Sequence, residues 1–471
     1  MGSRMYDAIV VGARISGAAV AFLLARRGHR VLLLDRATFP SPTASATNLI
    51  HPPGVARLRE WGVLERLAET RVPRITRYGL QSGPVRLEAP LPEVNGVSYA
   101  LSPPRTALDH ALVRCAADAG AQVREEASVQ ELLRDADGTV VGVRGVSKSA
   151  GAFTEKAAVV IGADGKNSKT AQLVGAATYR AEPVLSKSYW TYWEGLPQES
   201  VVRTYRAPGI HPFTWPTHDG LTIVGVAWPS ATFPAAAAGD DIDRLVIDAF
   251  AEVDPGLAAR LAGTARAGRW LTGAVPNFLR RPHGPGWALV GDAGATRDPI
   301  TASGITHALL SAELLADAVD AGLTGDVPLP QALAAYGRRR DDLVRDHYDY
   351  TRDYARIAAH SAEERALIEA MSRSPHHARA MVGVFATAVP PADFYTRAGF
   401  RELFDYLNDA AGLPLGIRAL RLLLHGAPEP LAAAPRALAD RLIAARLGPM
   451  GRLLLRSARP ARTPRTEGNH R

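Results

Sequence analysis

The sequence predicts an α/β fold in which a Rossmann-like unit is interrupted by an antiparallel sheet and followed by a helical C-terminal region. Three observations predict this fold. The chain opens on a strand, a glycine turn, a helix and a second strand within about 30 residues, which is one βαβ unit. An aromatic segment with alternating character begins near residue 184, and the residues beyond Pro330 have a helical pattern. With 471 residues, of which 47% are hydrophobic, the chain can form more than one core.

The βαβ unit comes first. Residues 6–12 form a short β-branched run that ends at glycine, which is typical of a buried parallel strand. Residues 16–27 carry an apolar stripe at helical spacing and are followed by a glycine that ends the helix. Residues 31–35 form a second apolar strand that ends in an acidic residue.

The turn of this unit carries a nucleotide-binding pattern. Gly12-Ala13-Arg14-Ile15-Ser16-Gly17 aligns with the dinucleotide fingerprint G-x-G-x-x-G, except that Arg14 replaces the second glycine. Gly12 allows the tight turn, and Gly17 lets the helix pack close to the strand. The helix N-terminus is then expected to face a pyrophosphate, and Asp35 a ribose.

The remaining elements follow in chain order. We expect a helix at 108–119, strands at 140–143 and 157–162, an aromatic strand at 188–194, a hairpin at 213–226, a strand at 287–292 and a helix at 304–321. Proline-rich breaks near 389–392 and 427–435 divide the helical C-terminal region. The aromatic strand and the hairpin predict a second domain built on an antiparallel sheet.

Two further motifs stand at strand ends. Gly162-Ala163-Asp164-Gly165 follows one apolar strand, and Gly291-Asp292-Ala293-Gly294 follows another, with Asp298-Pro299 and Gly304 downstream. An acid at the carboxyl end of a strand can hydrogen-bond a polyol chain. Either motif alone would be explained as a helix cap. Their occurrence in this order, after the glycine turn, predicts one shared binding site.

The charge distribution excludes a dedicated nucleic-acid binder. The formal net charge is +8, but residues 418–471 contain eleven arginines against three acidic residues and so carry the whole excess. The body of the chain is electrically balanced, so we expect no nucleic-acid partner. A single cysteine, Cys115, excludes an intramolecular disulfide and a cysteine-based metal cluster, and we expect no metal site.

The N-terminus predicts a cytoplasmic protein. It contains no hydrophobic run ending in a cleavage site, and the apolar stretch 15–25 is shorter than the roughly 20 residues that span a bilayer. Leucine clusters alternate with arginine in the basic tail. This pattern is compatible with a membrane or partner anchor, but helices packed on the body are the preferred interpretation.

Taken together, the three motifs resemble the FAD-dependent monooxygenases of the aromatic-hydroxylase type, whose relatives include the geranylgeranyl reductases and the flavin-dependent halogenases. The resemblance runs from residue 6 to residue 340. It implies a discontinuous FAD-binding domain at 1–76, 102–178 and 276–345, a substrate domain at 77–101 and 179–275, and a helical C-terminal region with the basic tail at 346–471.

The resemblance also implies which residues bind FAD. These are Gly12, Arg14, Gly17, Asp35, Arg36, Arg105, Asp164, Gly165, Asp292, Pro299 and Gly304. The segments 35–40, 51–55 and 216–220 are similar to a group of actinobacterial FAD-dependent oxidoreductases in which an arginine at position 14 is usual. Ala171 stands where the hydroxylases have an arginine. NAD(P)H is therefore expected as electron donor either directly or through a separate flavin reductase.

The implied function is insertion of one oxygen atom from O2, through a flavin hydroperoxide, into a small, largely apolar or aromatic substrate of specialised metabolism such as antibiotic biosynthesis. The candidate substrate pocket consists of Tyr189, Thr191, Trp193, Phe213 and Trp215. His51 and His218 are candidates for a catalytic base, because a hydroxylase acting on a phenol benefits from a group that titrates near neutral pH.

Two alternatives stay open. Trp215-Pro216 resembles a segment of the geranylgeranyl reductases, which favours reduction of an alkene. A non-catalytic flavin-fold binding protein, anchored by its basic tail, is the second alternative. The halogenase signature W-x-W-x-I-P is absent from the sequence.

Overall fold

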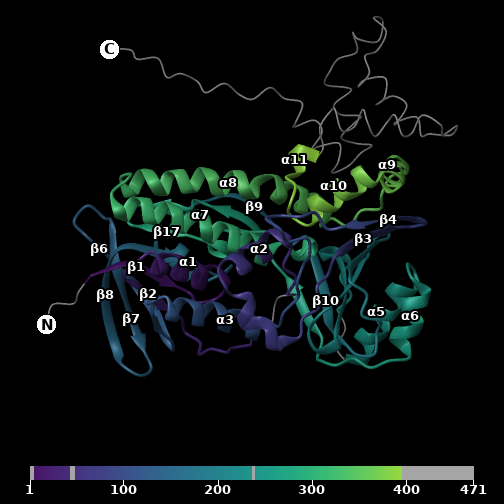
Figure 1. The fold of residues 1–471 in the computed structure, drawn as a ribbon, viewed down its shortest axis with the longest axis horizontal. Helices are drawn as coiled ribbons and strands as arrows, with labels where there is room; N and C mark the ends of the chain where they lie inside the picture. The colour runs from purple at the N-terminus through teal and green to yellow at the C-terminus, as the bar shows by residue number, and fades with distance from the viewer. Residues whose placement is uncertain (1–4, 43–47, 236–238, 395–471) are drawn as a thin grey trace, which may run out of the picture.

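The computed structural model of the protein describes residues 5–42, 48–235 and 239–394. Within these residues one sheet occupies one end of the molecule and a second sheet the other, and two long helices run along one side (Figure 1). The fold is therefore α/β, as predicted. The proline-rich break at 427–435 and the basic tail at 418–471 lie outside the described residues.

The first sheet has eight strands in the described chain. Six of them follow the order β16 (His283–Gly284), β17 (Trp287–Leu289), β8 (Gly151–Gly162), β1 (Tyr6–Val11), β2 (Val31–Leu34) and β5 (Gln122–Arg124). β6 (Ala127–Arg134) and β7 (Val140–Ser147) continue from β8 as an antiparallel meander. The core strands are parallel, with Val10 of β1 opposite both Leu33 of β2 and Ile161 of β8. The five strands predicted for this part of the chain, at 6–12, 31–35, 140–143, 157–162 and 287–292, are confirmed.

Helices cover this sheet and pack against its apolar strands. α1 (Ile15–Arg26), α3 (Arg105–Asp118) and α7 (Gly304–Thr324) share one core with the strands, which includes the fully buried side chains of Val20, Leu112 and Leu309. α2 (Pro52–Glu60) packs against α7. All three predicted helices of this region are present, and each boundary lies within three residues of its expected position.

The second sheet has seven strands in the described chain. Their order is β14 (Leu271–Ala274), β10 (Ser186–Trp193), β13 (Thr222–Pro229), β12 (His211–Pro216), β11 (Val201–Arg206), β3 (Arg77–Ser82) and β4 (Val85–Pro90). The predicted hairpin is β12–β13. One pair departs from the expected antiparallel arrangement, since β11 and β3 are parallel. These two strands come from distant parts of the chain, so no tight turn imposes an antiparallel direction on them.

Different helices cover the two faces of the second sheet. α5 (Gly239–Ala251) and α6 (Pro255–Ala262) pack on the outer face, which includes Tyr205 and Val224. The end of α8 (Leu329–Tyr354), with α9 (Ala362–Arg373) and α10 (Pro375–Phe385), packs on the inner face, which includes Tyr78 and Phe213. Figure 1 shows α7 and α8 side by side, with α9 and α10 above β3 and β4.

Short elements complete the described chain. A three-stranded sheet is formed by β18 (Ala295–Thr296), β15 (Asn277–Arg280) and β9 (Thr178–Glu182). The short helices are α4 (Lys169–Leu173) and α11 (Pro391–Phe394), and the 3-10 turns are η1 (Leu64–Thr70), η2 (His218–Gly220), η3 (Ser230–Thr232), η4 (Gly291–Ala293) and η5 (Pro299–Thr301). None of the described helices is long and apolar enough to cross a bilayer.

Candidate functional site

The predicted motifs meet at one edge of the first sheet. β1, β2, β8 and β17 are mutually parallel, so their carboxyl ends lie on the same side. Gly12, Asp35, Asp164 and Asp292 each follow one of these ends. Crevices outside the carboxyl ends of parallel strands are where open α/β folds bind ligands. The chain therefore assembles one candidate site from segments up to 280 residues apart.

The glycine turn is sterically required. Gly12 has φ +103°, and a Cβ atom there would lie 2.5 Å from the carbonyl oxygen of Ala163. A Cβ atom on Gly17 would lie 1.8 Å from the carbonyl oxygen of Gly12. α1 can therefore start directly beside the strand end. Its first turn has neither a side-chain cap nor an acidic residue, so its N–H groups face outward for an anion.

Asp35 holds the turn in shape. Its carboxylate accepts hydrogen bonds from the backbone N–H groups of Ala13, at 2.7 Å, and Ala37, at 2.8 Å. Each carboxylate oxygen retains a further lone pair, so hydrogen bonds from a ribose are still possible. The neighbouring Arg36 is exposed.

Arg14, the departure from the fingerprint, points away from the turn. Its guanidinium donates to the carboxylate of Asp109 at 2.8 Å. Arg105, at the start of α3, donates to the same carboxylate at 3.0 Å. Asp109 is completely buried and was not singled out from the sequence. The only feature of the sequence that indicates this contact is the i, i+4 spacing of Arg105 and Asp109, and that spacing is common on helices.

The side chain of Asp164 forms hydrogen bonds within the loop of the second motif. Its carboxylate accepts hydrogen bonds from the hydroxyl of Ser168 and from both the N–H and the hydroxyl of Thr170. These contacts fix the loop that precedes α4. Gly165 has φ +77°, with open space where a Cβ atom would stand. Asp164 therefore shapes the edge of the cleft.

Asp292 is exposed to solvent after the end of β17, and it defines the recess together with the cations Arg297, Arg105 and Lys166 near it. Removal from bulk water raises the pKa of its carboxyl group, and the nearby cations Arg297, Arg105 and Lys166 oppose that rise. These cations come from three separate segments of the chain. A Cβ atom on Gly12 would touch Ala163 and one on Gly291 would touch Ser16, so the three predicted motifs lie side by side.

The segment after Asp292 connects the recess to the second sheet. Asp298 is buried, and its carboxylate accepts hydrogen bonds from the N–H of Ser186 at 2.9 Å and from its hydroxyl at 2.6 Å. Burial raises the pKa of Asp298 to about 6. Pro299 begins η5, and Gly304 begins α7 with open space beside its Cα atom. Asp298 thus fixes the position of η5 against β10.

A cavity lies between η5 and the inner face of the second sheet. Its space is about 450 Å³, including the part that opens to solvent. Apolar and aromatic side chains form most of the wall, namely Leu49, Tyr78, Val202, Phe213, Trp215 and Ile300. The polar contribution comes from hydroxyl groups, those of Ser186, Ser188, Thr204 and Thr301. The cavity therefore suits a small, mostly apolar molecule.

The residues of the cleft fit FAD. The lack of a side chain at Gly12 lets the turn pass close to the backbone of Ala163 and Asp164, as a nucleotide-binding turn requires. The α1 N-terminus supplies donors for a pyrophosphate, and the accessible Asp292 carboxylate supplies acceptors for a polyol. Arg105 and Lys166 add positive charge beside the recess.

Comparison with known proteins also indicates FAD as the cofactor. The FAD binding domain family matches residues 5–209. A menaquinone reductase of Mycolicibacterium smegmatis is 28% identical over 361 residues, which cover 73% of this chain and 81% of that protein. A digeranylgeranylglycerophospholipid reductase of Methanothrix thermoacetophila is 28% identical over 373 residues, covering 75% and 88% of the two chains. Residues 5–209 therefore match an FAD binding domain, and the chain is similar to FAD-dependent oxidoreductases over about three-quarters of its length.

Solved structures share the fold of this flavoprotein. PqsL of Pseudomonas aeruginosa, described as a probable FAD-dependent monooxygenase, has a TM-score of 0.65 at 21% identity and covers 80% of this chain and 99% of its own. The flavin-dependent brominase Bmp2 has a TM-score of 0.69 at 17% identity, covering 86% and 98%. The chain therefore shares its α/β fold with these two proteins.

Two of the five predicted pocket residues line the cavity, and three do not. Phe213 and Trp215 line the cavity. Tyr189 and Trp193 instead pack on the outer face of the sheet with α5 and α6, and Thr191 donates to the carbonyl of Arg269. These three placements correct the expectation. Successive residues of a strand face opposite sides, and Ser186 and Ser188 are the residues of β10 that reach the cavity.

The two candidate bases have different surroundings. His51 is completely buried, and its Nε2 atom donates to the carbonyl of Thr301 at 3.2 Å. Burial lowers the pKa of His51 to about 4, so the ring is neutral at neutral pH. His218 is half-buried, and its ring meets that of Tyr192 edge-on at 5.2 Å. Burial lowers the pKa of His218 as well. Neither side chain lines the cavity, and their catalytic roles stay predictions.

Proposed function

We propose that this flavoprotein is a monooxygenase that inserts one oxygen atom from O2 into a small, largely apolar or aromatic molecule held against η5. The cavity of Phe213, Trp215 and Ile300 carries the proposal. Its wall is mostly apolar and aromatic, and an apolar site protects oxygen transfer from wasteful side reactions.

The balanced reaction consumes two electrons. The substrate C–H bond and O2, with two electrons and two protons, give a C–OH group and water. When bound, FAD supplies the redox chemistry with oxygen. We propose NAD(P)H as the source of the electrons, either directly or through a separate reductase. The chain's own residues bind FAD at Gly12 and Asp292 and orient the substrate through the cavity hydroxyls.

The polarity of the cavity narrows the substrate class. Tyr78 is the one residue with a titratable side chain among the described residues that line the cavity, and burial raises the pKa of its hydroxyl above the ordinary value. Tyr78 therefore acts as a hydrogen-bond donor rather than as a base at neutral pH. A substrate that must lose a proton before oxygen transfer fits this wall poorly, which favours a neutral, electron-rich molecule.

Reduction of an alkene is the second candidate. It is favoured by the menaquinone reductase and the digeranylgeranylglycerophospholipid reductase, each 28% identical over about three-quarters of the chain. This reaction adds a hydride to one carbon and a proton to the other. Neither a carboxyl group nor an imidazole lines the described part of the cavity, so a hydroxyl group would have to relay the proton. The monooxygenase fits the cavity better.

Oxygen labelling separates the two reactions. The purified FAD-loaded protein is reduced anaerobically with dithionite and mixed with ¹⁸O2 and a probe, either indole, 1-naphthol or geranylgeraniol. A product containing one labelled oxygen supports the monooxygenase. Two added hydrogens in geranylgeraniol, with no labelled oxygen in any product, would replace the proposal with the reductase.

A cavity-filling variant tests where the reaction occurs. Ile300→Trp places an indole in the cavity and is expected to abolish product formation while FAD content stays unchanged. Val327→Trp is the matched control, because Val327 is exposed after the end of α7. Full turnover in Ile300→Trp would show that the substrate binds elsewhere.

A further inference from the structure

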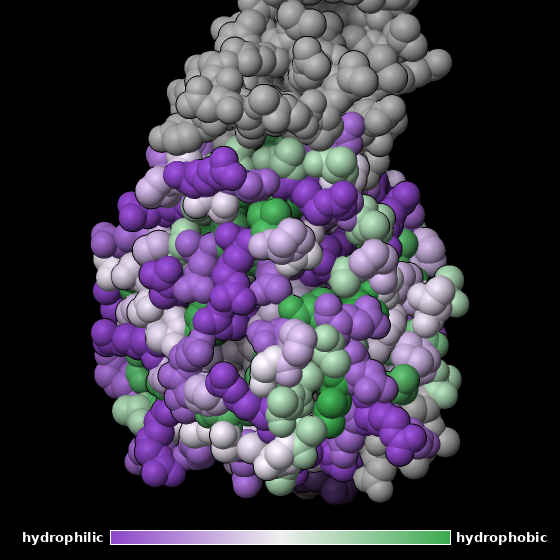
Figure 2. Space-filling model, turned by 90° about the vertical axis from the view of Figure 1, so that its right-hand side faces the viewer, coloured by the Kyte–Doolittle hydropathy of each residue, from purple (hydrophilic) through white to green (hydrophobic). Residues whose placement is uncertain are grey.

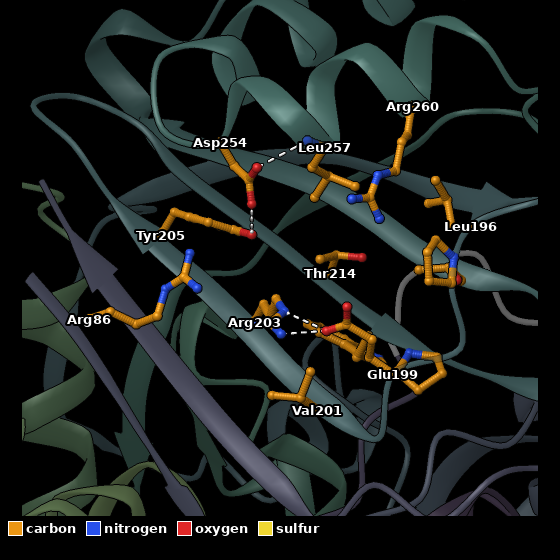
Figure 3. A pocket seen from close by; sticks show the side chains of 14 residues that line it. Arg86, Leu196, Glu199, Val201, Arg203, Tyr205, Thr214, Asp254, Leu257 and Arg260 are labelled. Carbon is orange, nitrogen blue, oxygen red and sulfur yellow. Dashed lines mark hydrogen bonds and ion pairs between the residues drawn. The ribbon is translucent and has the colours of Figure 1, made fainter. Parts of the chain in front are cut away.

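A second pocket opens on the outer face of the second sheet, between β11, β12 and α6 (Figure 3). It encloses about 700 Å³, including the space open to solvent. Its charged lining residues are Arg86, Arg203, Arg260, Glu199 and Asp254. The pocket is built by the substrate-domain sheet and does not include any residue of the FAD cleft.

Three of these charges are satisfied within the protein. Arg203 forms an ion pair with Glu199, drawn as dashed lines in Figure 3, and a second one with Glu88 at 3.1 Å. Asp254 accepts a hydrogen bond from the hydroxyl of Tyr205 at 2.8 Å and caps α6 through the N–H of Leu257 at 3.0 Å. These contacts fix the shape of the pocket.

The other two arginines have no acidic partner. Arg86 donates to the neutral side-chain oxygen of Gln81 at 2.9 Å, and Arg260 has no side-chain partner in the described part of the chain. Neither guanidinium lies within ion-pair distance of a described carboxylate. Figure 3 shows Arg260 reaching down from α6 toward Thr214, with Arg86 at the opposite end beside Tyr205. The pocket therefore presents two uncompensated positive charges.

An apolar wall completes the pocket. The apolar lining residues are Leu196, Pro197, Val201, Pro216 and Leu257. A ligand that matches both parts carries an anionic group and a compact apolar body. On the end of the molecule that carries α5 and α6, hydrophilic residues surround small hydrophobic areas (Figure 2). This mixed surface is unlike the broad apolar patches that mark protein interfaces, which favours a small molecule as occupant.

We propose that this pocket is a second ligand site, which binds a small organic anion, a carboxylate or a phosphate monoester, through Arg86 and Arg260. A guanidinium group can donate two parallel hydrogen bonds to a pair of oxygens on either anion. The ligand is not the flavin substrate, because the sheet lies between the two cavities: Arg203 and Tyr205 face outward, while Val202 and Thr204 line the inner cavity.

One residue connects the two cavities. Trp215 lines both, stacks on Phe213 at 5.2 Å and donates from Nε1 to the hydroxyl of Ser102. An occupant of the outer pocket therefore contacts the wall of the inner cavity. The site does not depend on which reaction the flavin performs.

Binding to the full-length FAD-loaded protein tests the proposal. Calorimetric titrations use benzoate and phenyl phosphate as anionic probes and phenol as the neutral analogue. Saturable binding of either anion, weakened at least tenfold in Arg86→Gln/Arg260→Gln, is expected, with no binding of phenol. Stronger binding of phenyl phosphate assigns the site to phosphate monoesters, and stronger binding of benzoate assigns it to carboxylates. Arg244→Gln, an exposed arginine on α5, is the matched control and should bind like the unmodified protein.

Two results would overturn the assignment. Unchanged anion binding in the double variant would exclude the two arginines. Loss of binding in Ile300→Trp, with binding retained in the double variant, would place the anion in the inner cavity instead. The exposed positions of Arg86 and Arg260 keep the fold and the FAD content intact in the variants, and the flavin absorbance checks this.

Discussion

The guanidinium of Arg14 lies 2.8 Å from the carboxylate of Asp109, a residue 95 positions further along the chain. This contact explains how an arginine replaces the second glycine of the nucleotide-binding turn. The side chain leaves the turn and reaches α3, where Arg105 shares the same carboxylate. Asp109 therefore ties the turn to the helix that borders the recess.

Asp109→Asn is expected to lower the free energy of unfolding by about 3 kcal/mol. The substitution leaves two arginines without their buried counter-charge, and breaking a buried ion pair costs roughly this amount. Urea unfolding of the two proteins measures the change. Asp118→Asn is the matched control on the same helix, because Asp118 pairs with Arg66 at the surface and exposed pairs contribute less than about 1 kcal/mol. Equal losses in the two variants would contradict the role of Asp109.

Gly12→Ala is expected to yield protein without FAD. The added Cβ atom would lie 2.5 Å from the Ala163 carbonyl oxygen, so the turn must move away from the strand end. The ratio of flavin to protein absorbance measures retention. Gly28→Ala tests the backbone conformation alone, since Gly28 also has positive φ but no neighbour within 4 Å, and it should retain FAD. Comparable flavin content in both variants would show that the close approach is unimportant.

Asp292→Ala is expected to weaken FAD binding at least tenfold, which corresponds to about 1.4 kcal/mol. The variant removes the accessible acceptor at the centre of the recess. Fluorescence titration of the deflavinated protein with FAD gives the dissociation constant. Asp137→Ala, in an exposed turn of the first sheet, should bind like the unmodified protein. An unchanged constant in Asp292→Ala would move the polyol contact elsewhere.

The protein is expected to lose stability as the pH falls below 6.5. Burial lowers the pKa of His51 to about 4 and those of His347 and His360 to about 3, so these groups add stability above pH 6.5 that is lost as the pH falls toward those values. Each adds a slope of up to about 1.4 kcal/mol per pH unit. Asp298 acts in the opposite direction, since its raised pKa favours the folded state below pH 3.8 and this advantage is lost as the pH rises through about 6.

A single variant isolates one of these histidines. His347→Gln should make the loss of unfolding free energy between pH 6 and pH 4.5 shallower by about 1.4 kcal/mol per pH unit. Urea unfolding at several pH values measures the slope. The exposed His376→Gln should leave it unchanged. If His347→Gln keeps the full slope, His347 is not one of the groups responsible.

The strand ends of the first sheet could be predicted from the sequence, because glycine and acidic residues follow the apolar strands and form a local pattern. Gly12 has a positive φ, which favours glycine, and Asp292 follows a short buried strand. Asp109 could not be found in this way. Its partner Arg14 is brought near only by the packing of α3 on α1, which no local pattern records.

The faces of β10 show a second limit. Trp190 on one face and Tyr189 on the other are both buried, because helices cover both sides of the sheet. Alternation between polar and apolar residues normally marks the buried face of a strand. When both faces are buried, this alternation is absent from the sequence. The predicted strand is confirmed, but the residues that face the cavity stand on the opposite face from the predicted ones.

The order of strands in the first sheet also determines when the molecule can load its cofactor during synthesis. β1 pairs with β8, and β8 pairs with β17, which ends at Leu289. The ribosome must therefore synthesise every strand of the second sheet before it synthesises β17, whose end completes the FAD site. Cofactor capture follows translation of the body of the enzyme, and a nascent chain that stops before β17 has an unpaired edge on β8 and no complete place for FAD.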